Sequence, residues 1–108
     1  MKNLEDAIIS STVKDIDTAL VMISTRLSWA FQKETFSKGT KVLEPIARRL
    51  LSHRNSLTNL KLSIDDKIPL GLLPSYLRLS TTATDYQNFA ETGLGSIIIP
   101  IINEVLND

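Results

Sequence analysis

Apolar residues recur every three or four positions through the first third of this 108-residue chain. The series comprises Ile9, Val13, Ile16, Leu20, Ile23, Leu27 and Ala30. This spacing repeats the a and d positions of a helix that packs lengthwise against another helix. No glycine or proline interrupts it, so the sequence predicts one long helix over residues 3–32, capped by Asn3. Residues 19–23 are apolar on most sides, and we expect the middle of this helix to meet two neighbours or a second subunit.

The middle of the chain continues the helical pattern after an interruption. Residues 33–40 lose the apolar periodicity and predict a loop. A second helix is predicted over residues 41–54, with Pro45 in its first turn, where a missing N–H costs nothing. Residues 57–64 fit both an alternating strand and a helical face. Helix is preferred there because no second clean strand offers a partner.

The last third predicts two further helices. Thr82 with Asp85 three residues later forms a partial capping box, and the helix that it begins should stop at Gly93. A final helix is predicted from Ser96, with Pro100 in its first turn. The isoleucines of residues 97–102 favour a strand by propensity, but their spacing fits a helix better. The predicted fold is therefore all-α, a compact bundle of four to five helices with a long N-terminal helix, forming a single domain over residues 1–108.

The composition excludes several classes of protein. The chain has no cysteine, which rules out disulfides, thiolate zinc sites and a cysteine nucleophile, and fits a reducing cytoplasm. The longest uncharged stretch, from Thr92 to Asn103, is much shorter than the roughly 20 apolar residues of a membrane-spanning helix. Glu5 and Asp6 break the basic-then-apolar order of a signal peptide. We therefore expect a small soluble cytoplasmic protein.

The formal net charge is zero, but the charges are distributed unevenly. Eight basic residues and two acidic residues lie between Arg26 and Lys61, whereas both ends of the chain carry an acidic excess. A basic middle is able to recognise an anionic partner. The preferred interpretation is that the acidic ends fold over the basic middle.

No group of residues predicts catalysis, a metal or a cofactor. His53 is the only histidine, and no carboxylate lies near it in the sequence to orient it. Asp65 and Asp66 lack the further oxygen ligands of a calcium loop and are interpreted as a turn. The glycines of residues 93–96 lack the lysine and third glycine of phosphate-binding loops, and are interpreted as a flexible link between helices. We expect a protein that is not an enzyme and that takes no small-molecule substrate.

The preferred function is a protein–protein interaction module, such as a small adaptor, inhibitor, immunity-type protein or assembly subunit. Its partner is another protein or a second copy of the chain. Val21 and Met22 flank the apolar stripe and are the sharpest candidates for contact with a partner. Trp29 is expected to anchor either the core, which is preferred, or an interface. Arg48 and Arg49 are expected on the exposed face of the second helix, in a basic patch with Lys41 and Arg54.

An alternative function rests on residues 73–94. The run from Leu73 to Ser80, followed by residues 81–86, resembles the helix-turn-helix of bacterial regulators. The resemblance implies a DNA-binding regulator with its recognition helix after Thr82. That helix carries no positive charge to meet phosphates or bases, and the last third of the chain is acidic, so nucleic acid is the less favoured partner.

Overall fold

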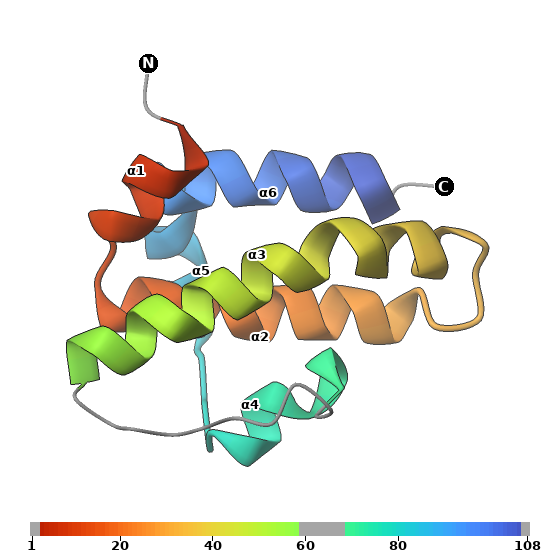
Figure 1. Cartoon of the computed structure of the whole chain (residues 1–108), viewed down its shortest axis with the longest axis horizontal. Coiled ribbons are helices and arrows are strands. Elements are labelled where there is room, and N and C mark those ends of the chain that lie inside the picture. The colour runs from red at the N-terminus through yellow and green to blue at the C-terminus, as the bar shows by residue number, and fades with distance from the viewer. Residues whose placement is uncertain (1–2, 59–68, 107–108) are drawn as a thin grey trace.

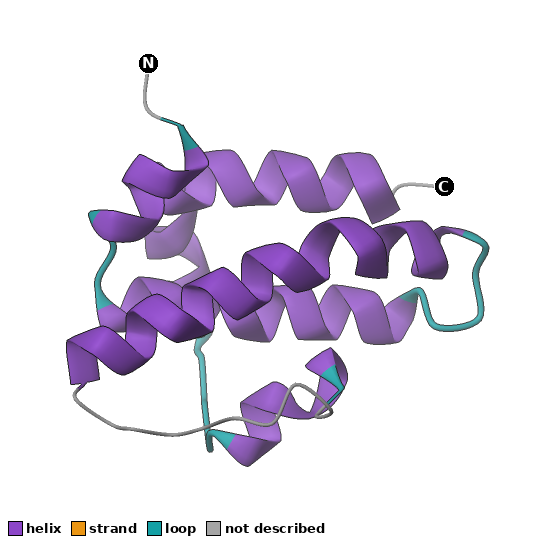
Figure 2. Ribbon diagram, viewed as in Figure 1, coloured by secondary structure: helices purple, strands orange, loops and turns teal. Residues whose placement is uncertain are grey.

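The structure is a computed structural model that describes residues 3–58 and 69–106. Within these residues all regular structure is helical and no strand occurs (Figure 2). The elements in chain order are α1 (Leu4–Ile9), α2 (Val13–Trp29), α3 (Thr35–Thr58), the 3-10 turn η1 (Leu70–Leu72), α4 (Leu73–Tyr76), α5 (Ala83–Ala90) and α6 (Gly93–Leu106). The predicted all-α bundle with a long helix near the N-terminus is confirmed.

Helices α2, α3 and α6 form the centre of the bundle, and each contacts the other two (Figure 1). α1 packs on α6 and α3, α5 packs on α2 and α6, and the η1–α4 segment packs on α2. Between them lies an aliphatic core with one aromatic ring; its fully buried members include Ile16, Leu20, Ile23, Leu43, Leu50, Phe89, Leu94, Ile98 and Ile102. Full burial of one such side chain contributes about 1.5–3 kcal/mol, so these contacts hold the helices together.

The predicted helix over residues 3–32 is divided into α1 and α2. Asn3 caps α1 as predicted, since its Oδ1 accepts the N–H of Asp6 at 2.8 Å. The break comes at Thr12, whose Oγ1 accepts the N–H of Asp15 at 3.2 Å while the Asp15 carboxylate accepts the N–H of Thr12 at 3.1 Å. This capping box starts a new helix and turns the chain. Ile9 therefore leaves the apolar stripe and is exposed, whereas the stripe from Ile16 to Ala30 is buried as predicted.

Helix α3 begins earlier and ends later than the predicted segment 41–54. The predicted loop over residues 33–40 is wrong from Thr35 onward, because the helix already includes these residues. Pro45 consequently lies in the helix interior, where it removes one backbone hydrogen bond. Gly39 is buried where α3 meets α6, and a Cβ atom there would lie 2.3 Å from Cδ2 of Leu106. Residues 57 and 58 are helical, and the rest of segment 57–64, with Asp65 and Asp66, lies outside the described residues.

Helix α6 begins at Gly93, three residues before the predicted start at Ser96. Thr92 Oγ1 accepts the N–H of Gly95 at 2.9 Å and so provides a partner for one backbone N–H in the first turn of the helix. The glycines are therefore helical and do not form a flexible link, and Pro100 lies in the helix interior. Residues 97–102 are helical, as their spacing predicted.

Among the described residues, no helix is by itself long and apolar enough to span a membrane. Helices α5 and α6 meet that criterion only as a pair, with a bend of 99° between them.

Helix α5 begins with the predicted capping box at Thr82. The Asp85 carboxylate accepts the N–H of Thr82 at 2.8 Å, and Thr82 Oγ1 accepts the N–H of Asp85 at 3.2 Å. The same carboxylate lies 3.1 Å from Nζ of Lys14 on α2. The hydrogen bond from the Thr82 backbone, followed by that from Lys14, lowers the pKa of Asp85 below its ordinary value of 3.8. This carboxylate thus joins α5 to the start of α2.

Replacing Asp85 with asparagine should lower stability near neutral pH. The folded state holds the ionised form of Asp85, so its contribution is present above the ordinary pKa of 3.8 and is lost as the pH falls through the lower pKa of the folded state. Urea unfolding of the wild type and Asp85→Asn should therefore give a difference at pH 7 that vanishes in acid. A difference that stays constant through the acid range would contradict this role.

Candidate functional site

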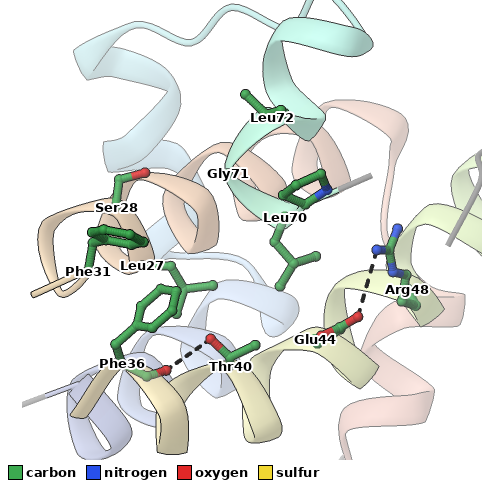
Figure 3. Close-up of a pocket in the computed structure, with 11 residues that line it drawn as sticks. Leu27, Ser28, Phe31, Phe36, Thr40, Glu44, Arg48, Leu70, Gly71 and Leu72 are labelled. Carbon is green, nitrogen blue, oxygen red and sulfur yellow. Dashed lines mark hydrogen bonds and ion pairs between the residues drawn. The ribbon is translucent and has the colours of Figure 1, made fainter. Parts of the chain in front are cut away.

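A pocket of about 490 Å³ opens between the C-terminal end of α2, the first half of α3 and η1 (Figure 3). Its volume lies within the roughly 300–1,000 Å³ of typical ligand pockets. Three segments distant in the sequence meet there. The described lining residues are Leu27, Ser28, Phe31, Phe36, Thr40, Glu44, Arg48, Pro69, Leu70, Gly71 and Leu72.

Two aromatic rings form one wall of the pocket. Phe31 follows the end of α2 and Phe36 lies in the first turn of α3, and their ring centroids are 5.3 Å apart with an angle of 71° between the planes. This edge-to-face arrangement is favourable for an aromatic pair. Phe31 nevertheless remains 66% exposed. The pair therefore offers apolar surface both to the pocket and to its mouth.

The opposite wall is the η1 turn, which a buried hydrogen bond attaches to α2. Ser24 Oγ donates to the carbonyl of Leu70 at 2.7 Å, and the Leu70 side chain is buried towards the core. Leu72 points outward and is 56% exposed. Tyr76, four residues further on in α4, is also exposed. The η1–α4 segment thus carries two exposed large apolar side chains, of which Leu72 lines the pocket.

The polar groups of the pocket are already engaged within the chain. Arg48 and Glu44 lie one turn apart on α3 and form an ion pair of 3.7 Å (Figure 3). The hydroxyl of Thr40 donates to the carbonyl of Phe36, and that of Ser28 donates to the carbonyl of Ser24, each at 2.9 Å. The described lining therefore presents an apolar surface with one charged pair and no activated nucleophile.

Two of the predicted partner-binding residues, Val21 and Met22, lie on α2 away from the pocket. Both are half-buried, and Met22 packs against the core. Helix α2 is covered on several sides by η1, α4, α5 and α6, in addition to α3. The prediction that its middle meets more than one neighbour therefore has an explanation within the chain itself.

The remaining predicted residues are dispersed. Trp29 is 70% exposed at the end of α2, so the preferred interpretation of a core anchor is wrong. Arg48 lines the pocket, but Arg49 lies elsewhere and donates from Nε and Nη2 to the carboxylate of Glu5 on α1. Arg54 is buried and donates from Nε to Asp17 on α2 at 2.5 Å. The predicted exposed basic patch is therefore divided, because acidic groups near the N-terminus pair with two of its members.

The segment that resembles a helix-turn-helix contains two short helices. α4 spans four residues and α5 spans eight, and residues 77–82 connect them. The exposed side chains of α5 include Thr84, Gln87 and Asn88. Arg78, in the connection, adopts a left-handed backbone conformation with φ of 56°. These helices present no basic surface of the kind that duplex DNA attracts.

Among the described residues, no three histidine or acidic side chains gather closely enough to hold a metal ion. Comparison of the chain with known proteins gave no matching family, no similar curated protein and no similar solved structure.

Proposed function

We propose that this protein is a non-enzymatic interaction module that binds an apolar side chain of a partner protein in the pocket between α2, α3 and η1. The observation that carries the proposal is the combination of an apolar pocket with exposed apolar residues at its mouth. Phe31 and Leu72 belong to both the lining and the exposed surface. This arrangement resembles the anchor pockets of protein interfaces, in which a few buried side chains supply most of the affinity.

A protein partner accounts for the surface better than a small molecule does. A small molecule inside the pocket would leave the outer faces of Phe31 and Leu72 in water. A partner with one inserted side chain would cover these faces with its neighbouring residues. Exposed apolar surface around a concave site is typical of protein interaction sites.

The chemistry of the pocket favours binding over catalysis. Thr40 and Ser28 donate their hydroxyl protons to helix carbonyls, and no histidine is among the described lining residues to activate them. Glu44, the single carboxylate of that lining, is paired with Arg48. General acid–base catalysis needs a positioned group free to exchange a proton.

Replacing Leu72 with serine should abolish most of the binding without unfolding the protein. We expect peptides selected from a displayed random library with the wild-type chain to bind Leu72→Ser at least about tenfold more weakly, a loss of about 1.4 kcal/mol. The side chain is 56% exposed, so its loss should change the free energy of unfolding by less than about 1 kcal/mol.

Ile9→Ser provides the matched control. Ile9 is 57% exposed at the end of α1 and does not line the pocket. The selected peptides should bind this variant as tightly as the wild type. Failure to select any peptide, or equal binding to all three proteins, would overturn the proposal.

A second copy of the chain is the other partner that the sequence predicted, and it is tested separately. Sedimentation equilibrium of the wild type and Leu72→Ser distinguishes the two cases. Dimers that dissociate in the variant would make the pocket a self-association site. A monomer in both would leave a different protein as the partner.

A further inference from the structure

The uncharged polar side chains of the pocket offer hydrogen-bond acceptors. The hydroxyls of Ser28 and Thr40 each donate their one proton to a helix carbonyl of their own chain at 2.9 Å. A hydroxyl oxygen that has donated its proton keeps lone pairs that accept. The carboxylate of Glu44 also accepts, and the guanidinium of Arg48 is already engaged with it. An apolar group that carries one hydrogen-bond donor therefore matches this lining best.

The size and the walls of the pocket favour an aromatic side chain. The volume of about 490 Å³ falls in the range that holds whole small-molecule ligands, so an aliphatic side chain would leave much of it empty. The edge-to-face pair of Phe31 and Phe36 presents ring surface on which a third ring is able to pack (Figure 3). Tryptophan combines a large ring with one N–H donor and no acceptor. It is therefore the side chain that the pocket fits best.

The chain itself carries such a side chain on its surface. Trp29 is the only tryptophan in the sequence, and it is 70% exposed. It is the last residue of α2 and directly follows Leu27 and Ser28, which line the pocket. Successive residues of a helix point about 100° apart. Trp29 is not among the described lining residues, so its indole does not fill the pocket of its own chain.

We propose that the partner is a second copy of this chain, whose Trp29 indole enters the pocket between α2, α3 and η1. This inference rests on the proposed function and names its partner. The indole ring packs against Phe36 and Leu70, and its N–H donates to the acceptors of Ser28 and Thr40. Tryptophan is among the residues that most often supply the binding energy of an interface.

Reciprocal insertion buries enough surface to hold a dimer. An aromatic side chain buries about 150–250 Å², and Trp29 and Phe31 are 70% and 66% exposed. Covering both residues in each copy removes several hundred Å² from water, and the pocket walls lose a comparable area. These areas supply much of the roughly 1,200 Å² that a specific interface buries in total. A two-fold dimer uses the same patch twice, and the end of α2 carries both the projecting indole and the pocket.

Sedimentation equilibrium and the fluorescence of the single tryptophan test the proposal on the full chain. The wild type should self-associate, and its emission should move to shorter wavelength as the concentration rises, because the indole leaves water. Trp29→Ala should weaken association at least about tenfold. Trp29→Phe keeps a ring without the N–H and should weaken it less. Ile9→Ala, at a residue that is 57% exposed on α1, is the matched control and should associate like the wild type.

A variant that fills the pocket supplies the complementary half of the test. A Cβ atom on Gly71 would lie 3.6 Å from Oγ of Ser28, so Gly71→Leu places its side chain in the pocket, whereas Gly71→Ala makes only an ordinary contact. Gly71→Leu should not self-associate, and Gly71→Ala should. Mixing Gly71→Leu with Trp29→Ala should give a one-to-one complex, because the first supplies an indole and the second an open pocket. Urea unfolding checks the fold of each variant, and Leu72→Ser takes the place of Gly71→Leu if the latter is unfolded.

Three results would overturn the exchange of Trp29. They are a wild type that stays monomeric at every concentration, association that Trp29→Ala leaves unchanged, and two folded variants that do not associate when mixed. None of them contradicts the proposed function, since a different protein would then be the partner. Selected peptides that bind Leu72→Ser as tightly as the wild type would instead overturn the proposed pocket itself.

Discussion

Replacement of Gly95 by alanine should destabilise the protein by about 3 kcal/mol or more, the upper range for overpacking a well-packed site. A Cβ atom at this position would lie 1.8 Å from the carbonyl oxygen of Phe89 and 2.7 Å from its carbonyl carbon. These are backbone atoms near the end of α5, so no side chain is able to move aside. The same carbonyl accepts the hydroxyl of Thr92 at 2.7 Å, and that hydroxyl oxygen accepts the N–H of Gly95. The added methyl group would therefore force α5 and α6 apart.

Gly93→Ala is the matched control, two residues earlier in the same helix. A Cβ atom at Gly93 would meet nothing within 4 Å. Alanine is favoured over glycine in a helix by up to about 1 kcal/mol, so this variant should be as stable as the wild type or slightly more stable. Urea unfolding followed by far-UV circular dichroism compares the three proteins. Equal midpoints for the two alanine variants would show that the turn between α5 and α6 relaxes freely.

The buried stripe and the fold class were predictable because they depend on periodicity alone. Ile16, Leu20, Ile23 and Leu27 lie at helical spacing and are buried in the structure. The same periodicity does not predict the break before α2. Ile9 and Val13 continue the apolar spacing across Thr12, yet the capping box of Thr12 and Asp15 begins a new helix at Val13. The spacing of Thr12 and Asp15 is itself a local signal for a helix start. In the structure, the hydrogen bonds of this capping box decide where the helix begins, and the apolar spacing does not.

The proline positions show a second limit of sequence interpretation. The sequence predicts Pro45 and Pro100 in the first turns of their helices, because a proline inside a helix loses a hydrogen bond. The structure accepts both in helix interiors, on exposed sides. Packing of the apolar faces of α3 and α6 extends these helices upstream and offsets the local cost.

The pocket could not be predicted because no single segment contains it. Phe31, Thr40 and Gly71 meet only after η1 folds back on α2, a contact carried by the hydrogen bond from Ser24 to Leu70. The sequence did single out Arg48, but as part of a solvent-facing patch. The sequence shows the charge of Arg48. Its position in the pocket wall depends on how α3 and η1 lie relative to each other, which the sequence does not show.

Replacement of Asp17 by alanine should cost about 2–3 kcal/mol, because it leaves the buried guanidinium of Arg54 without its carboxylate. The side chains of Arg54 and Asp17 are only 11% and 17% exposed, and they join α3 to α2. Glu5→Ala removes the corresponding carboxylate of the Arg49 pair, whose side chains are 38% and 51% exposed. A solvent-exposed ion pair contributes less than about 1 kcal/mol, so this control should leave the free energy of unfolding nearly unchanged. Chemical denaturation of both variants measures the difference, and equal losses would contradict the importance of burial.

The double variant Asp17→Ala, Arg54→Met separates two explanations for that loss. If the cost arises from an uncompensated buried charge, removing the arginine charge should restore more than half of the stability lost by Asp17→Ala. If the cost arises from lost attraction alone, the second substitution should add to the first or leave it unchanged. Recovery is the expected result, because methionine fills the space along α3 without a charge to solvate. Such recovery would show that the loss in Asp17→Ala comes from the buried charge of Arg54 left without a carboxylate, and that the ion pair itself adds little net stability.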